Sequence, residues 1–264
     1  MKELKVIIVY MSKGGVGKTT ATSILAYEMA KYGKTLMIDA DQQGDLTSLF
    51  FEDFSKIKKG DFCSVLKEEI ELKDAIIDCR ADDEESKDLK GLWILGTEKN
   101  SQLLKPYIEG QFRDSPYTIN SIIESAKELD FEYVFIDLPP SIGFYEKIML
   151  SCANEIIPIV QPEEFAIASL ANFNKLSKTL KTQLRASFEK IKYLILNCCD
   201  KSIKTHAFWM ESLKDSPFEV YEFNRSKSVS SATSMHKTLQ EQDKSNKICK
   251  TVAELALKLK KDGE

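Results

Sequence analysis

A glycine-rich string, SKGGVGKTT at residues 12–20, constrains the fold of this chain more than any other part of the sequence. It follows the apolar run 6–10, and its Gly-Lys-Thr ending matches the phosphate-binding loop pattern, GxxxxGK followed by Ser or Thr. The first glycine of that pattern is replaced by Met11 or Ser12, depending on the register. Glycines allow successive backbone N–H groups to point at phosphates, and a following helix adds its positive end. The string therefore predicts a strand, a phosphate-binding loop at residues 13–20 and a helix.

Each polar side chain of this loop has a predictable contact. Lys18 is placed to reach the β- and γ-phosphates, and the Thr19 hydroxyl to coordinate Mg²⁺. Thr20 is placed to hydrogen-bond a more internal phosphate. We therefore expect ATP and Mg²⁺ as cofactors, bound by a set of consecutive residues: Lys13, Gly14, Gly15, Val16, Gly17, Lys18, Thr19 and Thr20.

Apolar segments of strand length alternate with segments of helical periodicity along the chain. Strands are predicted at residues 5–10, 35–39, 92–95, 133–137, 155–160, 191–197 and 218–221. Helices are predicted at residues 19–32, 61–68, 119–129, 142–153, 166–187, 203–213 and 244–261. Near-continuous apolar runs such as 134–136 indicate strands buried on both faces. This pattern predicts an α/β, doubly wound, mostly parallel sheet with helices on both faces, forming one domain over residues 1–264.

Composition narrows the cellular context. No apolar run of 18 residues exists, and the N-terminal run 6–9 is too short for a signal peptide, so we predict a cytoplasmic protein. Six cysteines without a CxxC pair fit a reducing compartment, and two histidines do not favour a zinc site. The net charge of −4 gives no argument for nucleic acid by itself. The polar segment 80–90 is predicted to be an exposed insertion.

Four segments together resemble a known family. The string at 13–20 resembles the deviant Walker A motif of the ParA/MinD superfamily of SIMIBI P-loop proteins. Residues 39–47, DADQQGDLT, resemble the switch I segment of ParA (Soj-type) partitioning ATPases, usually DxDPQGN, with Gln42 in the place of the proline. Residues 135–143, FIDLPPSIG, resemble their Walker B and switch II, and residues 158–170 resemble the strand–helix junction that follows. The similarity covers almost the whole chain.

Three aspartates lie at or just beyond predicted strand ends. Asp137 ends a buried strand beside the loop, where a carboxylate can hold Mg²⁺ through a bound water. Asp41 corresponds to an aspartate associated with hydrolysis in the family, so the resemblance implies that it positions the attacking water. Asp39 is expected to support these groups rather than touch the nucleotide. Ordinary helix or turn capping is the alternative for Asp39 and Asp41.

The resemblance also implies roles for Lys13 and Asn197. In the family, the lysine that precedes the glycines reaches across an ATP-sandwich dimer to the partner's nucleotide, which makes Lys13 a catalytic candidate beside Lys18 and Asp41. An ATP-dependent homodimer follows, and a surface lysine without function is the alternative. Asn197 resembles the asparagine that reads the adenine edge, although a strand-ending asparagine in a turn is equally consistent with the sequence.

Members of this superfamily differ in what the dimer binds. For DNA, the sequence offers cationic candidates on one helix, before another, and in a segment that resembles the ParA pattern RxxRxSEAPS: Lys175, Lys178, Lys181, Arg185, Lys201, Lys204, Arg225 and Lys227. Such cations would neutralise phosphates without sequence preference, and solvated helix faces are the alternative. Only four residues precede the first strand, so no helix-turn-helix and no operator binding are expected. The last helix lacks a bulky aromatic face, so we expect it to pack on the domain without stable membrane insertion.

The sequence hypothesis is a ParA-like ATPase that hydrolyses ATP slowly and alternates between a monomer and a DNA-bound dimer. The resemblance implies a centromere-binding ParB-like partner and association with the nucleoid in the ATP state. One alternative is a MinD-like or other ParA-family ATPase that positions a protein or membrane cargo. The other is a nucleotide-binding regulatory module with little turnover.

Overall fold

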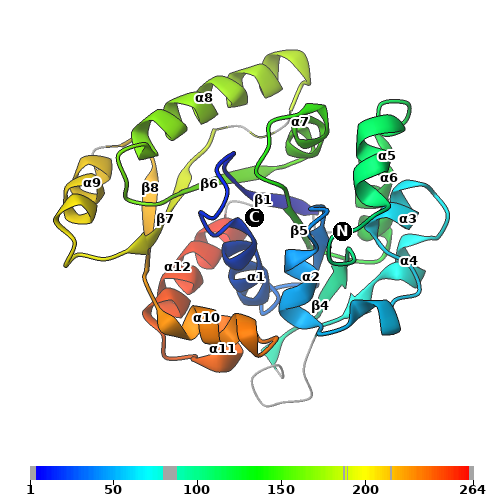
Figure 1. Cartoon of the computed structure of the whole chain (residues 1–264), viewed down its shortest axis with the longest axis horizontal. Coiled ribbons are helices and arrows are strands. Elements are labelled where there is room, and N and C mark those ends of the chain that lie inside the picture. Colours follow the sequence, from blue (N-terminus) through cyan, green and yellow to red (C-terminus); the bar gives the residue numbers. More distant parts are fainter. Residues whose placement is uncertain (1–3, 80–87, 187, 189, 215, 262–264) are drawn as a thin grey trace.

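A central β-sheet organises the computed structural model, which describes residues 4–79, 88–186, 188, 190–214 and 216–261. The polar insertion predicted at 80–90 therefore lies mostly outside the described residues. Within them the sheet has eight strands in the order β3-β4-β2-β5-β1-β6-β7-β8 (Figure 1). All neighbouring strands are parallel except β3, which runs antiparallel to β4. The predicted mostly parallel, doubly wound sheet is confirmed.

The strands agree closely with the sequence pattern. Five of them, β1, β2, β4, β5 and β6, have the predicted bounds, whereas β7 and β8 end later than predicted and the two-residue β3 was not predicted. The strands are β1 Lys5–Tyr10, β2 Thr35–Asp39, β3 Ile77–Asp78, β4 Leu92–Leu95, β5 Tyr133–Asp137, β6 Glu155–Val160, β7 Tyr193–Cys199 and β8 Glu219–Asn224. Residues of β1, β2, β5 and β6 are almost all buried, as a sheet covered on both faces requires.

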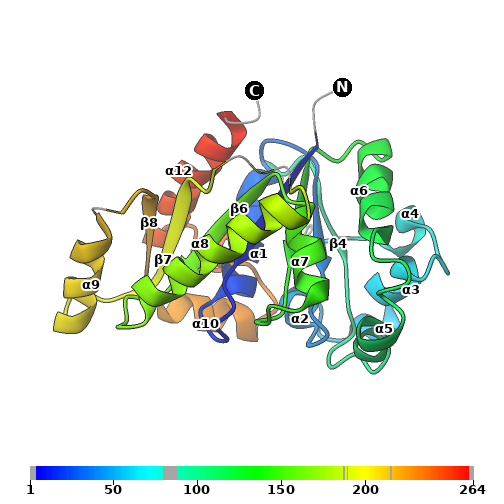
Figure 2. The ribbon, with the colours of Figure 1, turned by 90° about the horizontal axis from the view of Figure 1, so that it is seen from above.

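Helices cover both faces of the sheet. In Figures 1 and 2, α7 and α8 lie over one face and α1 and α12 over the other. The helices are α1 Lys18–Met29, α2 Asp45–Phe50, α3 Phe62–Leu66, α4 Leu72–Ala75, α5 Leu104–Gly110, α6 Thr118–Glu128, α7 Phe144–Ser151, α8 Ala166–Gln183, α9 Lys204–Lys214, α10 Lys227–Ser234, α11 Leu239–Gln242 and α12 Lys247–Lys261. The short helices α2, α4, α5, α10 and α11 were not predicted, whereas the helices predicted at 61–68 and 142–153 correspond to the shorter α3 and α7.

The strand order places the loop after β1 at a topological switch point. Strand β1 lies in the centre of the sheet, with β5 on one side and β6 on the other. The chain leaves β1 toward β2 on the β5 side, and reaches β6 on the opposite side only later. Ligands of open α/β sheets bind where the strand order reverses, at the carboxyl ends of the strands. The fold therefore directs attention to the loop that joins β1 to α1.

The last helix, α12, packs on the body of the protein. Its apolar face is buried against α1 and β8 and includes Ile248, Val252, Leu255, Ala256 and Leu259. This confirms the expectation that the C-terminal helix packs on the domain. None of the helices in the described part of the chain combines the length and the apolar character needed to cross a bilayer.

Leu255→Ala should test this packing. Leu255 is fully buried. Truncating its side chain should lower the free energy of unfolding by about 2–5 kcal/mol, because the missing atoms leave a cavity beneath α12. Leu257→Ala is the matched control, since Leu257 is 45% exposed and its loss should change stability by less than about 0.5 kcal/mol. Urea unfolding measures both. Equal small losses would mean that α12 does not pack on the sheet in solution.

Candidate nucleotide-binding site

The backbone of the loop between β1 and α1 depends on glycine. Gly15 and Gly17 have positive φ angles of 71° and 95°, a region that other residues rarely adopt. A Cβ atom at Gly17 would also lie 2.3 Å from the side-chain nitrogen of Asn197. Gly17 directly precedes α1, whose first turn has no acidic residue and no side-chain cap. The unpaired N–H groups and positive end of α1 thus remain available to an anion.

Lys18 is buried beneath this loop. Its ammonium group donates a hydrogen bond to the backbone oxygen of Lys13 at 3.2 Å, and only 7% of the residue is exposed. Burial lowers the pKa of Lys18, while the nearby carboxylates of Asp137 and Asp41 act in the opposite direction. A buried cation that faces a cradle of backbone N–H groups is suited to bind phosphate oxygens.

Thr19 and Asp137, predicted to share a metal ion, lie side by side. The Thr19 hydroxyl donates to Oδ2 of Asp137 at 2.7 Å. The carboxylate is fully buried, and its other oxygen, Oδ1, has no hydrogen-bond partner among the described residues. Hydroxyl and carboxylate oxygens are the ligands that Mg²⁺ prefers. An unsatisfied buried oxygen next to a hydroxyl and a phosphate cradle therefore fits the metal ion that a bound triphosphate would bring.

The pKa of Asp137 is raised to about 7, chiefly by burial. The hydrogen bond from Thr19 and the charge of Lys18 lower it, and the charge of Asp41 raises it. A divalent cation beside Asp137 would favour its ionised form. The site is thus electrostatically incomplete until a cation joins the carboxylate.

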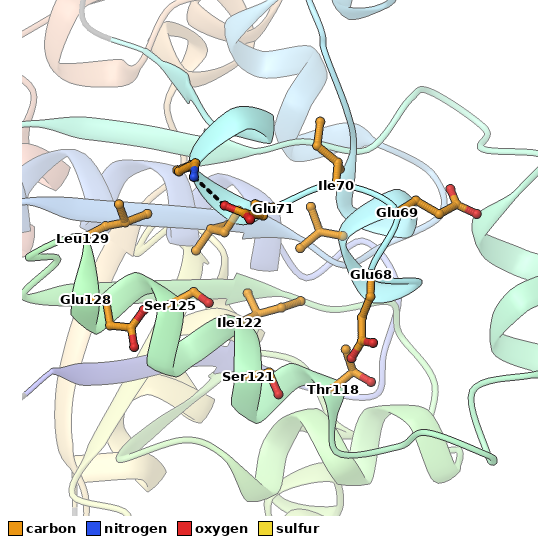
Figure 3. A pocket seen from close by; sticks show the side chains of 13 residues that line it. Glu68, Glu69, Ile70, Glu71, Thr118, Ser121, Ile122, Ser125, Glu128 and Leu129 are labelled. Carbon is orange, nitrogen blue, oxygen red and sulfur yellow. Dashed lines mark ion pairs between the residues drawn. The ribbon is translucent and has the colours of Figure 1, made fainter.

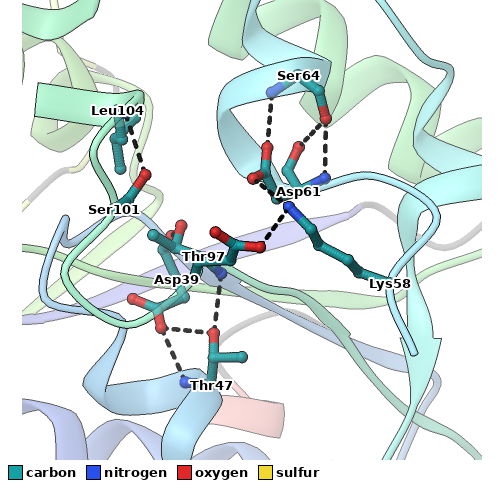
Figure 4. A network of polar contacts seen from close by, with 9 residues as sticks. Asp39, Thr47, Lys58, Asp61, Ser64, Thr97, Ser101 and Leu104 are labelled. Atoms are coloured by element: carbon teal, nitrogen blue, oxygen red, sulfur yellow. Dashed lines mark hydrogen bonds and ion pairs between the residues drawn. The ribbon is translucent and has the colours of Figure 1, made fainter. Parts of the chain in front are cut away.

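Asp39 fixes the start of α2. It ends β2 directly opposite Asp137 in the neighbouring strand, and its Oδ2 accepts hydrogen bonds from the Thr47 backbone N–H at 2.8 Å and hydroxyl at 2.6 Å. Thr97 completes the network, donating its N–H to Thr47 and its hydroxyl to the Asp39 backbone oxygen (Figure 4). These contacts hold the first turn of α2, which is the capping role considered from the sequence as the alternative for Asp39.

Asp41 lies at the mouth of the site. It is 9% exposed, and its Oδ1 accepts the N–H of Gln43 at 3.0 Å, so it also shapes the turn before α2. Burial raises its pKa, and Lys18 is close enough for its charge to oppose that shift. Asp41 therefore combines the turn contact with a position near Lys18.

The segment around Gln42 is held by backbone hydrogen bonds. The Ser101 N–H donates to the Gln42 oxygen at 2.8 Å, and the Asn100 N–H donates to the Gln43 oxygen at 3.1 Å. Gly44 then adopts a positive φ of 66°, where a Cβ would lie 2.7 Å from the Thr97 oxygen. Sequence reasoning placed Gly44 and Thr47 in the segment that resembles switch I without giving either a role, and it missed Thr97 and Ser101.

Glu146 stabilises the loop after β5. It accepts hydrogen bonds from the Ser141 hydroxyl at 2.6 Å and the Gly143 N–H at 2.5 Å, and Tyr10 donates to the Ser141 oxygen. The Tyr145 hydroxyl reaches the Ala40 oxygen at 2.8 Å, which ties α7 to the end of β2. Sequence reasoning also missed Glu146; its position three residues after the helix N-cap Gly143 was the available signal.

The side chain of Lys13 lies at the surface, in contact with Glu163. Its ammonium group forms an ion pair with Glu163 Oε2 at 2.7 Å, in the loop that follows β6. The two side chains are 47% and 43% exposed. The predicted catalytic residues therefore divide: Lys18 and Asp41 share the site with Thr19 and Asp137, whereas Lys13 lies at the surface.

A cavity of about 580 Å³ opens next to the loop. Asn197 lines it and also donates its side-chain N–H to the Val16 backbone oxygen at 2.8 Å, so it supports the loop from below. Gly15, Gly17 and Thr20 also line the cavity. Its size is within the range of small-molecule sites.

Gly14 lies beside the loop that follows β5. A Cβ atom at this position would be 3.8 Å from the Pro140 side chain, an ordinary van der Waals contact. Unlike Gly15 and Gly17, Gly14 does not have a positive φ angle. The backbone geometry of the loop therefore depends on the second and third of its glycines more than on the first.

A second cavity is remote from this site. It has a volume of about 490 Å³ and lies between the α3–α4 loop and α6, with several glutamates around it (Figure 3). Glu71 is ion-paired with Lys73. None of the residues of the phosphate-binding loop lines this cavity.

The eight cations considered for DNA do not form one surface. Lys175, Lys178, Lys181 and Arg185 are exposed along α8 or just after it, and α8 packs on β6 and α7. Lys201 is ion-paired with Glu222 at 3.3 Å, and Lys204 begins α9. Arg225 and Lys227 instead line the 580 Å³ cavity. Lys227 begins α10, which packs on α11, and α11 packs on α1, the helix on the face of the sheet opposite to α8.

Comparison with known proteins agrees with this geometry. Residues 4–190 match the family described as AAA domain. An uncharacterized protein of Borreliella burgdorferi is 24% identical over 239 residues, which are 89% of this chain and 91% of that protein. The sporulation initiation inhibitor protein Soj of Bacillus subtilis is 28% identical over 170 residues, 63% of this chain and 62% of Soj. The chain thus spans less than two thirds of the length of Soj.

A solved structure shares the fold over nearly the whole chain. The crystal structure of a putative plasmid partition protein from Borrelia burgdorferi, bound to AMPPNP, matches with a TM-score of 0.78 at 23% identity. The match covers 97% of this chain and 100% of that one.

Asp137→Asn should change how stability depends on pH. Without nucleotide, the folded protein keeps a proton on Asp137 up to about pH 7, whereas an unfolded aspartate releases it near pH 4. The free energy of unfolding of the wild type should therefore fall as the pH rises through this window. Asparagine cannot ionise, so the variant should gain on the order of 2–3 kcal/mol relative to the wild type between pH 5 and pH 8.

Urea unfolding in EDTA at both pH values measures this difference. Asp114→Asn, at an exposed carboxylate, is the control and should show no such gain. A constant difference between Asp137→Asn and the wild type would mean that burial does not hold the proton on Asp137.

Proposed function

The chain belongs to the AAA domain family that its residues 4–190 match. It is a ParA/MinD-type P-loop ATPase, and on that premise we propose that it is a cytoplasmic partition ATPase. In this proposal one domain binds and slowly hydrolyses ATP, forms an ATP-sandwich homodimer and binds DNA without sequence preference to segregate a plasmid or chromosome. The observation that carries it is the convergence of Lys18, Thr19 and Asp137 beneath a glycine loop.

ATP binding follows from groups that are already positioned. The loop amides and the start of α1 would hold the phosphates, and Lys18 would neutralise their charge. Thr19 and Asp137 would hold Mg²⁺, whose charge would offset the negative charge of the phosphates. Asp41 would orient the attacking water from the mouth of the site. Asn197 would contact the adenine from the wall of the cavity, while its side-chain nitrogen donates a hydrogen bond to the Val16 backbone oxygen.

Exposed apolar side chains around the site support self-association. Ile142 and Phe144 follow β5, Phe165 and Ile167 follow β6, and all four are between 41% and 66% exposed. Both loops lie at the carboxyl ends of the strands that flank β1. Apolar groups gathered around a ligand site favour a protein contact. A second copy that covers them would also bring its Lys13 toward the nucleotide.

Lys13→Ala should abolish ATP-dependent dimerisation or turnover while leaving some ATP binding. The lysine would add its charge across the interface, where it would stabilise the transition state. Glu163→Gln should not weaken the dimer, because Lys13 would no longer be held by its own subunit. An exposed ion pair contributes at most about 1 kcal/mol, so the gain in dimer affinity should be about fivefold or less.

Sedimentation with ATP, with ADP and without nucleotide measures dimerisation, and phosphate release measures turnover. Asp41→Ala is the matched control: it should still dimerise with ATP but lose turnover by about 10²-fold. A Lys13→Ala protein that dimerises and hydrolyses like the wild type would refute the cross-subunit role. Equal turnover in Asp41→Ala and the wild type would remove Asp41 from catalysis.

The row of cations on α8 is the best-supported DNA contact. Lys175 and Lys178 are exposed, and the structure describes no ion pair for either. The dimer would present two such rows, and a ParB-like centromere-binding protein would stimulate release. Association with the nucleoid in the ATP state would follow from weak contacts to many phosphates.

The double substitution Lys175→Ala and Lys178→Ala should weaken ATP-dependent binding to a random duplex. The slope of log K against log salt should become less steep by about 2 for each subunit that contacts the duplex, because each such subunit loses two phosphate contacts. Lys250→Ala, an exposed lysine on α12, should leave the slope unchanged. An unchanged slope in the double variant would exclude α8, and no DNA retention in any nucleotide state would favour a protein or membrane cargo.

A further inference from the structure

We propose that Arg225 contacts the nucleoside part of the bound nucleotide rather than DNA. The inference rests on the proposed ATP binding and adds a recognition residue to that site. It reassigns a cation that the sequence pattern places with the DNA candidates.

The lining of the cavity beside the phosphate-binding loop combines two kinds of chemistry. Gly15, Gly17 and Thr20 belong to the loop and the first turn of α1, where the phosphates would lie. The lining also includes apolar side chains of Ile24, Phe223, Val229 and Ile248, and the polar groups of Asn197, Asp200 and Arg225. A ligand with an anionic end and a flat, partly apolar end would match both parts of this lining.

The backbone fixes Arg225 at the edge of this cavity. It follows the last residue of β8, Asn224, which pairs with Cys199 of β7, and its N–H donates to the Cys199 oxygen at 2.9 Å. Ser226 then caps α10 by accepting the Ser228 N–H at 3.2 Å. The strand pairing before Arg225 and the helix cap after it leave the main chain little freedom at this position.

The guanidinium group of Arg225 is available for a ligand. Within the described residues it forms no hydrogen bond or ion pair, although its charge acts on two other residues of the cavity wall. The pKa of Asp200 is lowered chiefly by hydrogen bonds from Ser202, and the charges of His206 and Arg225 lower it further. It also opposes the burial that raises the pKa of Cys198. An arginine that faces a cavity without a bonded partner can stack its planar group on a nucleobase.

The position argues against a shared DNA surface with α8. That helix packs on β6 and α7, whereas α10 contacts α11, which contacts α1 across the sheet. In Figure 1, α8 and α10 lie at opposite sides of the molecule. A duplex bound along α8 would therefore leave Arg225 of the same subunit without a phosphate.

Calorimetry with ATP and with inorganic tripolyphosphate tests the assignment. Arg225→Ala should weaken ATP binding about three- to tenfold through the lost stacking, and should leave tripolyphosphate affinity unchanged. Arg225→Lys should recover little, because an ammonium group lacks the planar surface. Lys250→Ala, at an exposed cation on α12, is the control and should bind ATP like the wild type. Unfolding curves without ligand would confirm that each variant is folded.

The outcomes separate this inference from the proposed function. A wild type that takes up neither ligand would overturn the proposed ATP binding itself. A wild type that binds ATP, together with an Arg225→Ala variant that binds it equally well, would overturn only the role of Arg225. The role of Arg225 would also be overturned if Arg225→Ala weakened the binding of ATP and of tripolyphosphate equally, or if this variant no longer bound DNA at saturating ATP.

Discussion

The interaction on which the rest of this structure depends is the contact between the Thr19 hydroxyl and the buried Asp137 carboxylate. It joins the start of α1 to the end of β5, and so fixes the phosphate-binding loop against the centre of the sheet. The other carboxylate oxygen is buried and has no hydrogen-bond partner within the part of the chain that the structure describes. A buried polar atom without a partner is costly unless a ligand completes it. Stability and ligand binding are therefore coupled at one pair of residues.

The start of α2 and the loop before α7, which lie next to the Thr19–Asp137 pair, are each fixed by their own hydrogen bonds. Asp39 and Thr47 hold the start of α2, and Glu146 holds the loop before α7. Tyr145 connects the two segments through the Ala40 oxygen. Because Asp41 lies between these anchors, a change at the γ-phosphate would reach both α2 and α7 through a few short contacts. The structure thus has the physical links needed for a nucleotide-dependent change of surface.

The sheet and the loop could be predicted from sequence because their signals are local. Buried parallel strands are continuous apolar runs, and Gly15 and Gly17 mark the backbone that the phosphate-binding pattern requires. The Thr19–Asp137 pairing followed from the rule that ligands lie at the carboxyl ends of parallel strands. Short helices were missed, as was Thr97, whose role depends on a residue 58 positions away along the chain. The orientation of Lys13 toward Glu163 and of Arg225 toward the cavity likewise required the fold.

The ion pair between Lys13 and Glu163 has a consequence for the energetics of assembly. If Lys13 crosses to a partner's phosphate, it exchanges one anionic neighbour for another rather than leaving a free state. Both side chains are nearly half exposed, so water and mobile ions compensate much of what is lost on separation. The ion pair that Lys13 leaves would therefore oppose assembly only weakly, so the contact with the partner's nucleotide would still favour the dimer. Loss of the γ-phosphate on hydrolysis would remove that contact. Such a reversible exchange suits a protein that must cycle repeatedly between its associated and dissociated forms.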